Sequence, residues 1–219
     1  MERRFLDQRM AGVDVAEVEG RTVIRGLGAV FYDEAQADLT SFRFMIADKR
    51  SGKSVRVEER MMPGILAPST KTDDCVCLFD HDTRSVLGAL ANDTLKLIVE
   101  SRGVAYEAYP PETRDAQDVV LLLKGKYVKG SSFEFRADDQ HWSRKGDLII
   151  REVRSLKSIS DIGPVTRPAY KGTTADAELR SLTDMPEFTD LLTRNEQRQL
   201  RQREFRRLQV NGLKRNASV

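Results

Sequence analysis

The chain has 219 residues, of which 40% are hydrophobic and 32% are charged, and its formal net charge is +2. This balance is ordinary for a folded globular protein and excludes a disordered chain, and the length suits one domain with arms or a tail. The N-terminus has no apolar signal core, and no apolar stretch reaches the about 20 residues needed to cross a bilayer, so we expect neither a standard export signal nor contact with a membrane.

The first half of the chain predicts strands. Residues 20–32 are rich in β-branched and aromatic side chains, and residues 55–60 alternate apolar with polar before a Met-Met-Pro-Gly break. An apolar run at 76–79 predicts a third strand, which places His81 just beyond a strand end. The exit from a rigid element is a common place for a functional residue.

The two cysteines, Cys75 and Cys77, precede this histidine. Their spacing suits neither a disulfide across one residue nor a tetrahedral zinc site. The only histidines are His81 and His141, so a His/Cys site would need distant segments to meet. We therefore expect a reducing, cytosolic setting, no metal site and no cofactor.

The following segments add more strands and one helix. Residues 86–89 and 95–99 predict a hairpin, and an acidic turn followed by an apolar face predicts a helix between 111 and 126. A second hairpin is predicted over 142–151, and a strand over 153–162. The interpretation is an α+β chain that is mainly β.

Three side chains on or beside the predicted strands supply a base, a hydroxyl and an acid, namely His81, Ser132 and Asp161 in that order. A serine hydroxyl is a weak nucleophile at neutral pH, so a serine hydrolase needs an imidazole to take its proton and a third group to fix the tautomer of that imidazole. Ser131 competes with Ser132, because a shift of one residue along a strand reverses the face.

The identity of the acid is also open. Asp82 is adjacent to His81, yet neighbouring residues of an extended segment point to opposite faces, so a distant carboxylate such as Asp161 is geometrically easier.

The end of the chain is strongly basic. Past Pro186 the apolar residues recur at a spacing typical of a helix face. We therefore expect a domain over residues 1–180 and a basic helical tail over 181–219. Such a tail is most often a solvated helix face, and its charge also fits salt-sensitive contact with nucleic acid or another acidic partner. Its basic residues are Arg194, Arg198, Arg201, Arg203, Arg206, Arg207, Lys214 and Arg215.

Three short motifs carry a resemblance to a known family. They are His81-Asp82 with Leu87-Gly88, then Gly130-Ser131-Ser132-Phe133-Glu134-Phe135, then Asp161-Ile162-Gly163-Pro164-Val165-Thr166-Arg167-Pro168-Ala169-Tyr170. In order, spacing and residue type, the chain from about residue 20 to 175 resembles the prohead proteases of tailed bacteriophages. Each motif is weakly specific alone, but their combination is specific.

The resemblance implies a serine endopeptidase that cleaves the major capsid protein or a scaffold protein inside the assembling prohead, in the host cytoplasm. It implies that Ser132 is the nucleophile, His81 the general base and then acid, and Asp161 the orienting carboxylate. His141 remains an alternative to the carboxylate, because herpesvirus assembly proteases use a second histidine. The implied fold is the β-barrel with surrounding helices of those herpesvirus enzymes.

Further interactions are expected for the whole chain. We expect that the chain cleaves itself and forms a homo-oligomer, and the charge of the basic tail favours contact with nucleic acid. The alternative function is a non-catalytic assembly or nucleic-acid-binding protein of the capsid interior on the same fold.

Overall fold

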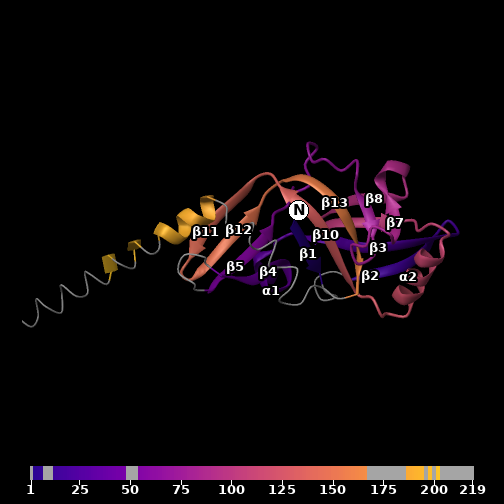
Figure 1. Ribbon diagram of the computed structural model, residues 1–219, viewed down its shortest axis with the longest axis horizontal. Helices are drawn as coiled ribbons and strands as arrows, with labels where there is room; N and C mark the ends of the chain where they lie inside the picture. The colour runs from indigo at the N-terminus through magenta and orange to yellow at the C-terminus, as the bar shows by residue number, and fades with distance from the viewer. Residues whose placement is uncertain are drawn as a thin grey trace, which may run out of the picture.

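The computed structural model describes residues 2–6, 12–47, 54–166, 186–194, 197–198 and 201–202. Within these segments the chain forms thirteen strands in three sheets (Figure 1). The prediction of a mainly β chain is confirmed.

The first sheet has five strands and contains both Ser132 and Asp161. Two of its strands, β10 and β13, are long antiparallel neighbours, and β13 also pairs in parallel with β6. In spatial order the strands are β1 (Glu2–Leu6), β10 (Gly130–Ala137), β13 (Leu156–Val165), β6 (Val76–Leu78) and β7 (Val86–Ala89).

The second and third sheets have four strands each. In Figure 1 these two sheets lie on opposite sides of the described domain, with β1, β10 and β13 between them. The order of the second sheet is β2 (Val13–Val18), β3 (Arg21–Val30), β9 (Gly103–Ala108) and β8 (Leu95–Glu100). That of the third is β11 (Gln140–Lys145), β12 (Leu148–Val153), β5 (Ser54–Met61) and β4 (Ser41–Ala47).

Two short α-helices lie between the strands, together with the 3-10 helices η1 (Glu34–Gln36) and η2 (Leu90–Asn92). The one-turn helix α1 (Ala37–Thr40) precedes β4, and α2 (Arg114–Lys124) lies against β2. The Thr113 hydroxyl accepts a hydrogen bond from the Ala116 N–H at the start of α2, and Gly125 ends it. The helix predicted between 111 and 126 is therefore confirmed.

Two features of the predicted topology are wrong. Strands β7 and β8 do not form a hairpin: β7 pairs with β6 in the first sheet and β8 with β9 in the second. The predicted β-barrel is also not found, since none of the three sheets of described strands closes on itself. The physical reason is that the edge strands of each sheet, such as β1 and β7 of the first, do not pair with each other, and between β10 and β13 the chain leaves the first sheet to form β11 and β12 of the third.

The hydrophobic core lies mainly between the first two sheets. Phe133 and Phe135 of β10 stack with ring centroids 4.9 Å apart and share one buried cluster with Tyr106 of β9. A separate cluster lies on the third sheet, where Phe188 of the helical residues 186–194 packs edge-on against Trp142. The predicted boundary at residue 180 and most of the tail lie outside the described residues, so the division into 1–180 and 181–219 stays a prediction.

A buried ion cluster joins the first sheet to the third. Arg4 of β1 and Arg151 of β12 both bond the carboxylates of Glu2 and Glu59, and Glu59 and Arg151 are fully buried. Burial raises the pKa of Glu59, but the attraction of Arg4 and Arg151 outweighs it and holds this pKa below its ordinary value. The two guanidinium groups and two carboxylates thus offset one another's charge in the interior.

Removing one member of this cluster leaves buried charge without compensation. The variant Arg151→Met should lower the free energy of unfolding by about 3–5 kcal/mol. The matched control is Arg154→Met, which breaks the Arg154–Glu152 pair, whose arginine side chain is 47% exposed, and should cost at most about 1 kcal/mol. Urea unfolding of both variants measures the difference, and equal losses would contradict the account.

The cluster also predicts the acid sensitivity of the fold. Because the pKa of Glu59 is lower in the folded chain, its contribution to stability is complete above the unfolded pKa of about 4.3 and is lost as the pH falls through the folded value. The free energy of unfolding, measured by urea between pH 7 and 3, should therefore fall more steeply below about pH 4.3 in the parent than in Glu59→Gln. Parallel curves for the two proteins would be evidence against this linkage.

Candidate active site

The three predicted residues meet in one hydrogen-bonded line. The Nε2 atom of His81 lies 2.6 Å from Oγ of Ser132, and Nδ1 of the same ring bonds Oδ2 of Asp161. When Nδ1–H donates to the carboxylate, Nε2 is left as an acceptor for the proton of the serine hydroxyl. This is the order that nucleophile activation requires.

Strand register determines which serine faces the imidazole. Ser132 pairs with Gly163 across β10 and β13, and Glu134 pairs with Asp161, so Ser132 and Asp161 project from the same face. Ser131 projects from the other face, where its hydroxyl lies 3.1 Å from the Tyr106 hydroxyl in the core. Of the two serines considered, Ser132 is the one that contacts His81.

Gly163 allows the strand of Asp161 to approach the strand that leads to His81. A Cβ at this position would lie 2.1 Å from the carbonyl oxygen of Leu78, the last residue of β6. No side chain can be accommodated there without moving β6 away from β13. Sequence reasoning gave Gly163 no role, because only the paired strands reveal this contact.

The turn after β6 holds His81 in an unusual backbone conformation. Asp80 and His81 have φ angles of 52° and 59°, in the left-handed region that residues with a side chain seldom adopt. Two such residues in succession turn the chain sharply, and the imidazole then reaches back over the sheet to Ser132 and Asp161. Strain of this kind is concentrated at functional sites.

The two alternatives for the acid are located elsewhere. The carboxylate of Asp82 bonds Arg84, and this hydrogen bond lowers its pKa to about 2. His141 lies on β11 opposite Glu152, in the third sheet. Of the three groups considered, Asp161 is the one whose contact with His81 the geometry provides.

The groups behind the site are buried and uncharged. Burial raises the pKa of the Cys75 thiol to about 12 and that of Cys77 well above its usual value, and the charge of Asp161 adds to both effects. Burial likewise raises the pKa of Tyr106. Neither thiol is therefore a nucleophile near neutral pH.

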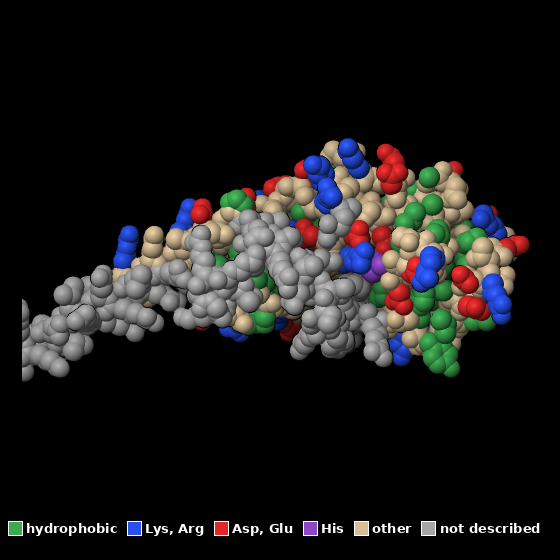
Figure 2. Space-filling view, viewed as in Figure 1, with side chains coloured by type: hydrophobic (Ala, Val, Ile, Leu, Met, Phe, Trp, Pro, Cys, Tyr) green, Lys and Arg blue, Asp and Glu red, His purple; other side chains and the backbone are tan. Residues whose placement is uncertain are grey.

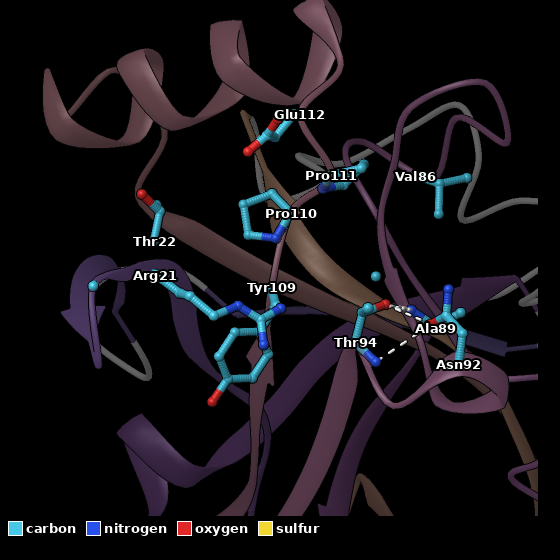
Figure 3. A pocket seen from close by; sticks show the side chains of 12 residues that line it. Arg21, Thr22, Val86, Ala89, Asn92, Thr94, Tyr109, Pro110, Pro111 and Glu112 are labelled. Carbon is cyan, nitrogen blue, oxygen red and sulfur yellow. Dashed lines mark hydrogen bonds between the residues drawn. The ribbon is translucent and has the colours of Figure 1, made fainter.

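Among the described residues, no three His, Cys, Asp or Glu side chains are grouped to hold a metal ion. None of the helices in the described part of the chain is long and apolar enough to span a membrane. A pocket of about 490 Å³ lies beside β7, lined in part by Arg21, Tyr109 and Pro110 (Figure 3). The guanidinium of Arg21 lies over the Tyr109 ring there, 4.6 Å from its centroid. None of the three residues of the hydrogen-bonded line contributes to this pocket.

Comparison with known proteins finds one matching family. The family model described as caudovirus prohead serine protease matches residues 14–188, which is most of the chain and includes all three residues. No curated protein matches, and no solved structure matches.

The close approach at Gly163 can be tested directly. Gly163→Ala should lower the free energy of unfolding by about 1–3 kcal/mol, because the added methyl forces β6 and β13 apart. Gly12→Ala is the control: no heavy atom lies within 4 Å of a Cβ there, and the change should stay within about 0.5 kcal/mol. Urea unfolding compares the two variants. If Gly163→Ala is as stable as Gly12→Ala, β6 can move away from β13 without a loss of stability, and the prediction is wrong.

Proposed function

Because the chain belongs to the caudovirus prohead serine protease family, we propose that it is a serine endopeptidase that cleaves segments of a scaffold or capsid protein during phage head assembly and maturation. The single observation that carries the proposal is the imidazole of His81, which bonds both Ser132 and Asp161. Membership of the family supports a role in capsid maturation, and the geometry supports these three residues as the catalytic ones.

In the acylation step, Oγ of Ser132 attacks the carbonyl carbon of the scissile peptide bond. Its proton passes to Nε2 of His81, and the carbonyl oxygen takes the negative charge of the tetrahedral intermediate. The intermediate collapses when the C–N bond breaks and His81 returns the proton to the leaving amine. The products of this half are a free amine and an acyl ester on Ser132.

In the deacylation step, water replaces the amine. His81 takes a proton from the water as its oxygen bonds the ester carbon, and the C–O bond to Ser132 then breaks. Ser132 recovers its proton from His81, and the second product leaves as a carboxylic acid that ionises. The cycle needs no metal and no cofactor.

Asp161 acts through the imidazole. Its bond to Nδ1–H holds the tautomer in which Nε2 is free to accept a proton, and its charge stabilises the imidazolium of each intermediate. The burial of both side chains, each 7% exposed, strengthens this electrostatic interaction relative to one in water.

The proposed partners follow from the family and the charge of the chain. The substrate is the major capsid protein or a scaffold protein, met inside the prohead in the host cytoplasm, and the chain also cleaves itself and forms a homo-oligomer. Nucleic-acid contact is assigned to the basic residues beyond 181. On the face seen in Figure 2, acidic and basic side chains of the described residues are interspersed.

One observation favours the second candidate, a non-catalytic protein of the capsid interior. The exposed fraction of Ser132 is 0%, so a peptide reaches its Oγ only after some rearrangement. This candidate predicts binding to head proteins without any change in their mass.

Cleavage of the natural partners separates the candidates. When the purified chain is incubated with the capsid and scaffold proteins of the same phage, mass spectrometry should detect defined fragments. Ser132→Ala should reduce the cleavage rate by up to about 10⁶-fold, because the nucleophile is lost. Ser131→Ala removes the neighbouring hydroxyl from the opposite face and should stay within about tenfold of the parent. Fragments produced equally well by Ser132→Ala would refute the proposed nucleophile.

A further inference from the structure

The residue before His81 is tied to the strand that carries Asp161. The N–H of Thr166 donates to Oδ1 of Asp80 over 2.8 Å, and the Thr166 hydroxyl donates to Oδ2 over 2.9 Å. The N–H of Asp80 donates in turn to the carbonyl oxygen of Pro164 over 3.1 Å. Three hydrogen bonds therefore connect one residue of the β6–β7 turn to the end of β13.

These contacts act where the backbone is least favourable. Asp80 and His81 are both in the left-handed region, which side chains disfavour. A turn of this kind persists only when surrounding contacts hold it. The hydrogen bonds of Asp80 with Thr166 and Pro164 are such contacts, and they hold the backbone at Asp80, the first of the two left-handed residues.

The three hydrogen bonds of Asp80 fix the position of His81 relative to Ser132 and Asp161. Pro164 pairs with Ser131 on β10, the residue next to Ser132, and Asp161 lies three residues before Pro164 on β13. The turn of His81, the carboxylate of Asp161 and the hydroxyl of Ser132 are thus all held by one pair of strands, β10 and β13. Relaxation of the turn would move the imidazole while leaving Ser132 and Asp161 in place.

Asp82, on the other side of His81, shows the contrast. Its carboxylate bonds the backbone N–H and the guanidinium of Arg84, two residues along the same turn. That contact is local and makes no connection to β13. Two aspartates flank His81, and of these Asp80 is the one bonded to the strand of Asp161.

We propose that Asp80 and Thr166 are positioning residues, which hold the β6–β7 turn so that the imidazole of His81 is aligned between Ser132 and Asp161. The proposal rests on the proposed function for its kinetic consequence, but its structural consequence is independent of it. Neither residue contacts the reacting atoms.

The test compares the full chain with four variants, and a fifth variant, His81→Gln, serves only to assign the NMR signal. Asp80→Ala removes both acceptors, and Thr166→Val removes the hydroxyl donor alone. Asp80→Asn is the conservative variant, because an amide accepts from the Thr166 N–H through Oδ1 and donates to the hydroxyl through Nδ2. Asp82→Ala is the matched control on the other side of His81.

The kinetic measurement is labelling by an alkyl fluorophosphonate, with the saturation constant and the maximal rate determined separately. Asp80→Ala should lower the maximal rate by about 10- to 100-fold and leave the saturation constant unchanged, as expected for a nucleophile whose base is misaligned by about 1 Å. Thr166→Val should show a smaller loss of the same kind. Asp80→Asn and Asp82→Ala should stay within about threefold of the parent.

The structural measurement is the proton NMR signal of Nδ1–H of His81, assigned by its loss in His81→Gln. It should broaden or vanish in Asp80→Ala and persist in Asp80→Asn and Asp82→Ala. If Asp80→Ala does not fold, Thr166→Val decides the matter by the same two measurements. A parent that resists labelling would defeat the proposed function, yet the NMR comparison would still test positioning. Parental labelling rates and an unchanged signal in Asp80→Ala and Thr166→Val would overturn the proposal.

Discussion

The antiparallel pairing of β10 with β13 is the constraint on which the site depends. Its register opposes Ser132 with Gly163 and sends Ser132 and Asp161 to one face, whereas Ser131 enters the core. A shift of one residue would exchange the two serines and remove the hydroxyl from His81. The stacked rings of Phe133 and Phe135 anchor that register, because they are fully buried against the second sheet.

Whether a buried group of this protein is charged depends on the charged groups beside it. Glu59 keeps its charge because Arg4 and Arg151 surround it, and this cluster also connects β1, the neighbour of the serine strand, to the third sheet. Next to Asp161, burial and the charge of that carboxylate raise the pKa of the Cys75 and Cys77 thiols, so both stay protonated near neutral pH. The imidazole of His81 is the described hydrogen-bond partner of the Asp161 carboxylate.

Much of this arrangement could be predicted from the sequence. The mainly β character follows from strand periodicity, and His81, Ser132 and Asp161 follow from three motifs in order. The hairpin of residues 86–89 with 95–99 was wrong because each of these strands pairs with its other neighbour along the chain, β7 with β6 and β8 with β9, and a local pattern does not show which neighbour a strand pairs with. The strand pattern alone left Ser131 and Ser132 open and the family resemblance favoured Ser132, whereas the register shows why Ser132 is the serine that contacts His81.

The measurement that tests the central claim most directly is the site of modification by an alkyl fluorophosphonate, read by intact mass and then by peptide mapping. The account predicts one adduct per chain, located on Ser132 and absent when His81 is replaced by Gln, because the hydroxyl is activated only through that imidazole. An adduct on Ser131, or equal labelling of Ser132 with and without His81, would contradict it.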